Sequence, residues 1–232
     1  SRAATEFDLW SEPGSGMALI ARFAVRGKQD SSKVRVGVVC TPIAGESVCG
    51  DAWIVEPVNA GFMIALVDGL GHGPDAAFAA DTALDIIRRN KTKEPIQILE
   101  AANNALRPTR GAAVQIVTLD LRAREIRSAG VGNISASVIN HEKSKIMPSH
   151  PGIVGHQMPR ARETVLPWHA DSLLAMHSDG ISARWLMEKY PGLRLRHPSL
   201  AAGVIYRDFA RPRDDATMLM LSETTTSHGL RP

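Results

Sequence analysis

The sequence predicts an α+β fold, a sandwich of antiparallel strands covered by helix pairs. Many short apolar segments bounded by turn residues are typical of β-strands, and most follow one another without a helix between them. Two pairs of helical segments interrupt this series, near residues 73–106 and 181–210. Helices inserted in pairs favour a helix-covered sandwich, because a parallel α/β fold would alternate strand and helix regularly.

The first half of the chain supplies a hairpin, three strands and one helix pair. Residues 7–23, FDLWSEPGSGMALIARF, contain two apolar strands around a turn, and such a hairpin needs a surface to pack on. The polar stretch RGKQDSSK follows as a linker. Strands are then expected at residues 34–40, 52–58 and 62–67. A helix begins at Gly73 with Pro74 in its first turn, and a second helix ends near Leu106.

The second half returns to short strands and closes with the other helix pair. Strands are expected within AAVQIVTLDL, REIRSAG, ISASVIN, KIMPS, ETVLPW and SLLAMHSDG, of which the first two form an antiparallel pair. Helices are expected around residues 181–190 and 198–210. The segment DATMLMLS forms the last strand.

The composition fits a folded cytoplasmic protein. The 232 residues are 44% hydrophobic and 22% charged, enough for one large domain with a small appendage. No apolar run approaches the roughly 20 residues that cross a membrane, and no signal peptide opens the chain. The net charge of +3 is accompanied by few aromatics and no reading motif, so we expect no nucleic-acid partner. Cys40 and Cys49 are read as reduced, because they fit neither a disulfide framework nor a CxxC metal site.

Acidic residues at the ends of apolar strands carry the strongest functional signal. Each has a glycine or a loop beside it: Asp51, Asp68, Asp179 and the pair Asp214 and Asp215. A single Asp-Gly is usually a turn, but carboxylates that the sheets bring to one rim repel one another. Divalent cations remove that repulsion, and an all-oxygen site favours Mg²⁺ or Mn²⁺ over zinc or copper. Two such ions activate a bridging water for attack on a phosphoryl group.

The order of these acids resembles a known family. The pattern GD…DGLG…SDG…DDAT, with RGAAVQIVTLDL, SAGVGNISASVI and GIVG, is similar to the PPM (type 2C) metal-dependent serine/threonine protein phosphatases. The bacterial SpoIIE and RsbX branch is the best match, over about residues 34–222. The resemblance implies a four-layer α-β-β-α sandwich with two antiparallel sheets and a dinuclear Mn²⁺ or Mg²⁺ centre on its edge. It also implies hydrolysis of phosphoserine or phosphothreonine on proteins.

The resemblance assigns a role to each acid. The expected metal ligands are four catalytic carboxylates and one backbone carbonyl: Asp51, Asp68, Asp179, Asp214 and Gly69. Asp68 is expected to bridge the two ions. Asp214 is favoured over Asp215 because the first acid of the pair matches the family ligand.

Two positions depart from the family pattern. Eukaryotic members carry a histidine directly after the first Asp-Gly, proposed as the acid for the leaving alkoxide, whereas Leu70 fills that place here. His72 follows two residues later, and both a catalytic and a merely local role remain open for it. No arginine precedes Asp51, where eukaryotic enzymes use one to grip phosphate. We therefore expect a slow, partner-dependent enzyme whose metals bind the phosphoryl group largely alone.

Other kinds of site fit less well. The HSD at residues 177–179 is not a Ser-His-Asp triad, because adjacent strand residues point to opposite faces. DGLGHG lacks the Lys-Ser/Thr ending of a P-loop and the glycine spacing of histidine-kinase-type ATPases. The remaining rival is a regulatory binding module that keeps the fold without turnover, and the retained acids favour the enzyme.

The hairpin suggests the biological context. Residues 1–26 resemble the C-terminal end of RsbT/RsbW-type anti-sigma-factor kinases, which implies the tail of a preceding kinase-like domain before a phosphatase domain at 27–232. The expected substrate is then a phosphorylated STAS-domain protein, an anti-anti-sigma factor or stressosome component. The oligomeric state stays open.

Overall fold

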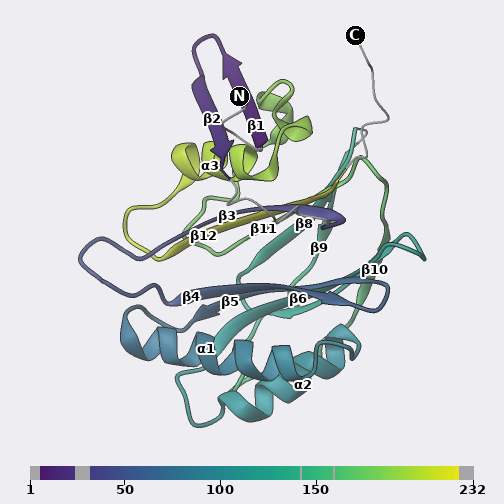
Figure 1. The fold of residues 1–232 in the computed structure, drawn as a ribbon. Coiled ribbons are helices and arrows are strands. Elements are labelled where there is room, and N and C mark those ends of the chain that lie inside the picture. The colour runs from purple at the N-terminus through teal and green to yellow at the C-terminus, as the bar shows by residue number, and fades with distance from the viewer. Residues whose placement is uncertain (1–5, 24–31, 142, 159, 225–232) are drawn as a thin grey trace.

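Two five-stranded antiparallel sheets lie face to face, and helices cover the outer face of each (Figure 1). The structure is a computed structural model that describes residues 6–23, 32–141, 143–158 and 160–224. One sheet is covered by two helices and the other by a third: α1 (Pro74–Arg89), α2 (Pro95–Leu106) and α3 (Pro198–Phe209). This arrangement confirms the predicted α+β sandwich of four layers.

The first sheet has the strand order β10-β7-β6-β5-β4. Its strands are β4 (Asp51–Val58), β5 (Gly61–Gly69), β6 (Ala112–Asp120), β7 (Glu125–Val131) and β10 (Thr164–Pro167). The central strands β5 and β6 are buried along most of their length, because helices cover one face and the second sheet covers the other. This double burial explains why β5 reads as a continuous apolar run instead of an alternating one.

The second sheet has the order β3-β12-β11-β8-β9. Its strands are β3 (Val34–Thr41), β8 (Ser135–Ile139), β9 (Ser144–Met147), β11 (Leu173–His177) and β12 (Ala216–Glu223). Strand β12, from the end of the chain, pairs with β3 along its whole length. The two sheets therefore each contain strands that are far apart in the sequence.

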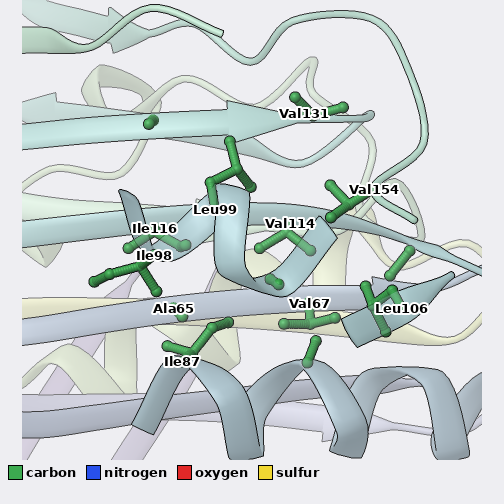
Figure 2. Close-up of a cluster of buried hydrophobic side chains, with 14 of the residues drawn as sticks. Ala65, Val67, Ile87, Ile98, Leu99, Leu106, Val114, Ile116, Val131 and Val154 are labelled. Carbon is green, nitrogen blue, oxygen red and sulfur yellow. The ribbon is translucent and has the colours of Figure 1, made fainter. Parts of the chain in front are cut away.

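Three layers of apolar side chains hold the four layers of backbone together. Figure 2 shows the layer between the first sheet and its helices, where Ile98 of α2 lies near Ile116 of β6 and Ile87 of α1 lies near Ala65 of β5. The face that α1 turns to the sheet contains small side chains, including the fully buried Ala80 and Ala83. Small side chains let the helix backbone approach the strands closely.

The N-terminal hairpin packs on the helix of the second sheet. Strands β1 (Glu6–Glu12) and β2 (Gly16–Arg22) pair in the register expected for a hairpin, and both contact α3. Trp10 is only 2% exposed, and its indole Nε1 donates to the carbonyl oxygen of Pro191 over 2.9 Å. The predicted domain boundary at residue 26 lies outside the described residues. No helix in the described part of the chain is both long and apolar enough to cross a membrane.

The prediction of a helix at residues 181–190 is wrong. The segment contains only a short 3₁₀ turn at Met187–Lys189. Its backbone bonds outward, since the Ser182 amide donates to the carbonyl of Phe209 over 2.9 Å and Ile181 forms a bridge with Ala210. These contacts with the end of α3 replace the hydrogen bonds within a helix. The second sheet is thus covered by one α-helix and by the 3₁₀ turns Met187–Lys189 and Leu193–Leu195 instead of a helix pair, and the hairpin packs on α3.

Candidate metal centre

Two acids of the first sheet stand directly opposite each other. Asp51 begins β4, Asp68 lies one residue before the end of β5, and the antiparallel register pairs them. Like charges directly opposite on neighbouring strands are destabilising, so this placement is costly for the fold unless something compensates for it. Asp51 is buried, with 5% of its surface exposed, and Asp68 is half-buried.

Two acids of the second sheet reach the same place. Asp179 follows β11 and Asp214 precedes β12, two strands that pair with each other. Together with Asp68 they line a cavity of about 500 Å³, the acidic cavity. Its other lining residues include Leu70, Gly71, His72, Asn133 and Ile153. The four acids predicted from the sequence therefore gather at one edge of the sandwich, where the two sheets meet.

Glycines beside the acids permit this close approach. A Cβ on Gly69 would lie 2.1 Å from the backbone oxygen of Ala76 in α1. A Cβ on Gly180 would lie 2.0 Å from the backbone oxygen of Asp215. Both distances are far below van der Waals contact, so each Asp-Gly pair marks a place where backbone packs against backbone.

The carboxylates disturb one another strongly. Burial raises the pKa of Asp68 to about 8, and the charges of Asp51 and Asp179 add to that rise. Burial also raises the pKa of Asp51 to about 6. The pKa of Asp214 is raised by burial and then by the charge of the nearby Asp179 carboxylate. Protons therefore take the place of a positive charge in this cavity at moderate pH.

A hydroxyl from the second sheet holds Asp51. The Ser178 Oγ donates to Asp51 Oδ2 over 2.6 Å and accepts from the Thr217 amide over 3.0 Å. The nearby Thr217 side chain also lowers the pKa of Asp51, although its hydroxyl oxygen has no hydrogen-bond partner among the described residues. Asp51 Oδ1 is buried and has no hydrogen-bond partner among the described residues. A buried carboxylate oxygen without a partner is the kind of atom that a cation satisfies.

The other residues near these acids either orient a carboxylate in the cavity or hold the surrounding backbone in place. Asn133 Nδ2 donates to Asp179 Oδ2 over 2.6 Å and orients that carboxylate. Asp215 is structural, because its two oxygens accept from the backbone amides of Ile43 and Gly50 over 2.8 and 2.9 Å. Asp215 is thus occupied in fixing the segment that leads to β4, whereas Asp214 faces the cavity.

His72 lines the cavity but is paired on its outer side. Its Nδ1 lies 2.9 Å from Glu46 Oε1, and its side chain is 58% exposed. Leu70, in the position of the eukaryotic histidine, is also exposed. Arg110 lies near the same rim, where its guanidinium packs against the Gly71 backbone and bonds Asp75 over 2.5 Å.

The donor set fits hard divalent cations. All the expected donors are oxygen atoms, and one of them, Asp51 Oδ1, is buried without a hydrogen-bond partner among the described residues. The raised pKa of Asp68 means that this carboxyl holds a proton that a cation would displace. In the described residues, no three His, Cys, Asp or Glu side chains already surround one point closely enough to hold an ion. Binding therefore needs side-chain rotations within the acidic cavity. The expected ligand set and the bridging role of Asp68 remain predictions.

The HSD sequence is not a triad. Ser178 turns its hydroxyl to Asp51, whereas the His177 ring packs against Trp185 with ring centroids 6.0 Å apart. The His177 Nδ1 bonds the backbone oxygen of Ser178, and burial lowers the pKa of the imidazole. The side chains of His177 and Ser178 therefore point to different surroundings, as the alternation of side chains along a strand predicts.

Comparison with known proteins gives a consistent result. Residues 59–223, more than half of the chain, match the family described as stage II sporulation protein E (SpoIIE). The phosphoserine phosphatase RsbX of Bacillus subtilis (strain 168) is 22% identical over 139 residues, which cover 60% of this chain and 70% of RsbX.

Solved structures share the fold. A chain of the structure "The bacterial stressosome: a modular system that has been adapted to control secondary messenger signaling" is 28% identical, with a TM-score of 0.76. The match covers 82% of this chain and 100% of that one. RsbX in complex with magnesium is 19% identical with a TM-score of 0.70, and the match covers 85% of this chain and 98% of RsbX.

Proposed function

Because the chain belongs to the stage II sporulation protein E (SpoIIE) family, we propose that it is a metal-dependent protein serine/threonine phosphatase of the PPM class. The observation that carries the proposal is the convergence of carboxylates from both sheets on one cavity, where burial, and after it the neighbouring carboxylates, raise the pKa of Asp68 to about 8. Such a cluster of carboxylates is suited to binding cations.

Five groups would hold the cations, which we propose to be two Mn²⁺ or Mg²⁺ ions: the carboxylates of Asp51, Asp68, Asp179 and Asp214, and the carbonyl of Gly69. When bound, the ions supply a water of lowered pKa and polarise the phosphoryl oxygens. Asp68 would bridge the ions, because it pairs with Asp51 in its own sheet and also feels the charge of Asp179 from the other.

The surrounding residues position these carboxylates. Ser178 fixes one oxygen of Asp51 and leaves the other free for a cation. Asn133 fixes Asp179 in the same way. Asp215 holds the backbone of Gly50 and so fixes the start of β4. The ligands are thereby oriented by groups that are not themselves ligands, as effective metal sites require.

The substrate we propose is a phosphoserine or phosphothreonine on a STAS-domain signalling protein. RsbX, a relative of this chain, is described as a phosphoserine phosphatase, and the stressosome structure is 28% identical. The cavity is open and lined by loops of both sheets, which suits a phosphorylated residue presented on a protein surface.

Phosphate release from a phosphorylated STAS-domain protein tests the proposal. We expect release with Mn²⁺ and almost none with a chelator. Asp68→Asn and Asp179→Asn should each nearly abolish release while the circular dichroism spectrum is unchanged. Asp81→Asn, an exposed acid of α1, is the matched control and should keep full activity. Metal-independent release, or none from the wild type with any divalent ion, would contradict the proposal and favour a binding module.

A further inference from the structure

The two cysteines of the chain lie side by side, close to Asp51. Cys40 belongs to β3 of the second sheet, and Cys49 belongs to the segment that leads into β4 of the first sheet. The Cys40 thiol donates to Cys49 Sγ over 3.6 Å, and both residues are half-buried thiols that are not bonded to each other. Both residues are therefore partly exposed to solvent.

The segment that carries Cys49 is fixed at both ends. Asp215 accepts hydrogen bonds from the amides of Ile43 and Gly50, so the chain between β3 and β4 is held against the second sheet. Cys40 Sγ also lies 3.8 Å from the backbone oxygen of Asp51. The loop between β3 and β4 is thus anchored, and it holds the two sulfur atoms close together.

The geometry requires little movement for a covalent bond. A disulfide has a sulfur–sulfur length of about 2.05 Å, so sulfurs now 3.6 Å apart must approach by about 1.5 Å. Rotation of the two side chains and a small shift of the loop supply that approach. A sequence separation of nine residues closes a short loop, which limits the entropy lost on bonding.

We propose that Cys40 and Cys49 are a reversible oxidation site that closes an intramolecular disulfide in the presence of a peroxide. One thiolate attacks a peroxide oxygen, which breaks the O–O bond and gives a sulfenic acid and, for hydrogen peroxide, water. The second thiolate attacks the sulfenic sulfur, the S–S bond forms, and hydroxide leaves as a second water. Two thiols lose two electrons and two protons in total, and a dithiol reverses the reaction.

The bond acts on the acidic cavity through the backbone. Cys49 lies two residues before Asp51, and the movement that brings its sulfur to Cys40 pulls on Gly50 and the start of β4. The Asp51 carboxylate is held from the other sheet by Ser178, so a shift of its backbone changes its orientation. We expect oxidation to weaken Mn²⁺ binding, and this second step relies on the metal site proposed above.

Peptide mapping tests the first step. The reduced protein is treated with hydrogen peroxide, blocked with an alkylating agent and digested without reductant. We expect one peptide pair linked through Cys40 and Cys49, a mass lower by two hydrogen atoms, and full recovery of both thiols with dithiothreitol. Cys40→Ser and Cys49→Ser should each prevent the link. Bonds between molecules, or sulfinic acid at either residue without a link, would overturn the proposal.

Direct Mn²⁺ binding tests the second step, by calorimetry or by electron paramagnetic resonance of free Mn²⁺. We expect the oxidised wild type to bind about fivefold more weakly or worse than the reduced protein. A Cys40→Ser, Cys49→Ser double variant should bind equally before and after peroxide. Equal affinities of the oxidised and reduced wild type would disprove the coupling. If the reduced protein binds no Mn²⁺, the proposed metal site fails, and the peptide map still decides the disulfide.

Discussion

Asp68 stands where four carboxylates meet, and its environment determines how the protein responds to pH. It lies opposite Asp51 in its own sheet and faces Asp179 and Asp214 from the other. Without cations, the neutral form of Asp68 is favoured up to about pH 8. The same carboxylate that binds a cation is therefore a strong competitor for protons.

The metal-free protein should lose stability as the pH rises. The pKa values of Asp51 and Asp68 in the folded protein are about 6 and about 8, both above the ordinary 3.8. The folded protein therefore holds protons that the unfolded chain has released, and this stabilisation is present at low pH and disappears as the pH rises through 6 and then 8. Urea unfolding in a chelator, between about pH 5 and pH 9, measures it.

Asp68→Asn should flatten that pH dependence. The amide cannot ionise, so the variant should be more stable than the metal-free wild type at high pH, by about 1.4 kcal/mol for each unit of pKa elevation removed. Asp81→Asn is the control, since that acid is exposed on α1 and should leave the pH profile unchanged. A wild-type stability that increases between pH 6 and pH 8 in the chelator would contradict the assignment.

His72 should matter much less than the carboxylates. Its ring pairs with Glu46 and is exposed, so it is not fixed beside Asp68 as the buried Asp51 is. We expect His72→Ala to lower kcat by about tenfold or less, whereas Asp68→Asn nearly abolishes turnover. Initial rates of phosphate release from the phosphoprotein at saturating Mn²⁺ distinguish the effects of the two substitutions. Equal losses would make His72 a catalytic acid.

At this scale the sequence could predict the acids but not the residues that orient them. Asp51, Asp68 and Asp179 are recognisable because each ends or begins an apolar strand beside a glycine. Ser178 reaches Asp51 across 127 residues of sequence, and no local pattern marks such a contact. The role of Asn133 likewise depends on which loops become neighbours in space.

At the scale of elements, the site depends on how closely α1 approaches β5. The Ala76 backbone lies against Gly69, the residue that follows Asp68. Strand and helix boundaries here were predictable because burial and helix-start signals agree in this segment. The segment at 181–190 was not predictable in the same way, because its backbone bonds to the end of α3.

The substitution Gly69→Ala should push helix α1 away from strand β5. The added Cβ would lie 2.1 Å from the Ala76 oxygen, so the variant should lose about 1–3 kcal/mol of stability and bind Mn²⁺ more weakly. Gly203→Ala in α3 is the matched control, since no atom lies within 4 Å of its added Cβ. That variant should gain about 0.5–1 kcal/mol, because alanine favours the helix. Urea midpoints and calorimetric Mn²⁺ titrations measure both. Unchanged stability and Mn²⁺ affinity in Gly69→Ala would show that the helix does not position the ligands.

At the scale of the whole molecule, the proposed ligands come from both sheets. Asp51 and Asp68 belong to the first sheet, and Asp179 and Asp214 flank strands of the second. The four-layer order was predictable from the family resemblance, whereas the packing of Trp10 of the hairpin onto α3 was not.

Cations should therefore raise the thermal stability of the entire domain. Binding to the folded state alone adds about 2.7 kcal/mol when the free ion is at 100 times its Kd. We expect Tm to rise with Mn²⁺ concentration in the wild type and to rise far less in Asp179→Asn, where the second sheet loses a ligand. Differential scanning fluorimetry at several Mn²⁺ concentrations provides the measurement. A Tm independent of Mn²⁺ would rule out binding at this edge of the sandwich.

The pairing of β3 with β12 has a consequence for synthesis on the ribosome. The second sheet joins residues 34–41 to residues 216–223, so its edge strand β3 cannot pair with β12 until residue 223 has been made. Asp214 lies just ahead of that strand, and the fourth carboxylate therefore becomes available only after synthesis has passed residue 214. Contacts of such long range fold slowly. The proposed metal centre can thus form only after Asp214 has been synthesised, and products that end before that residue cannot assemble it.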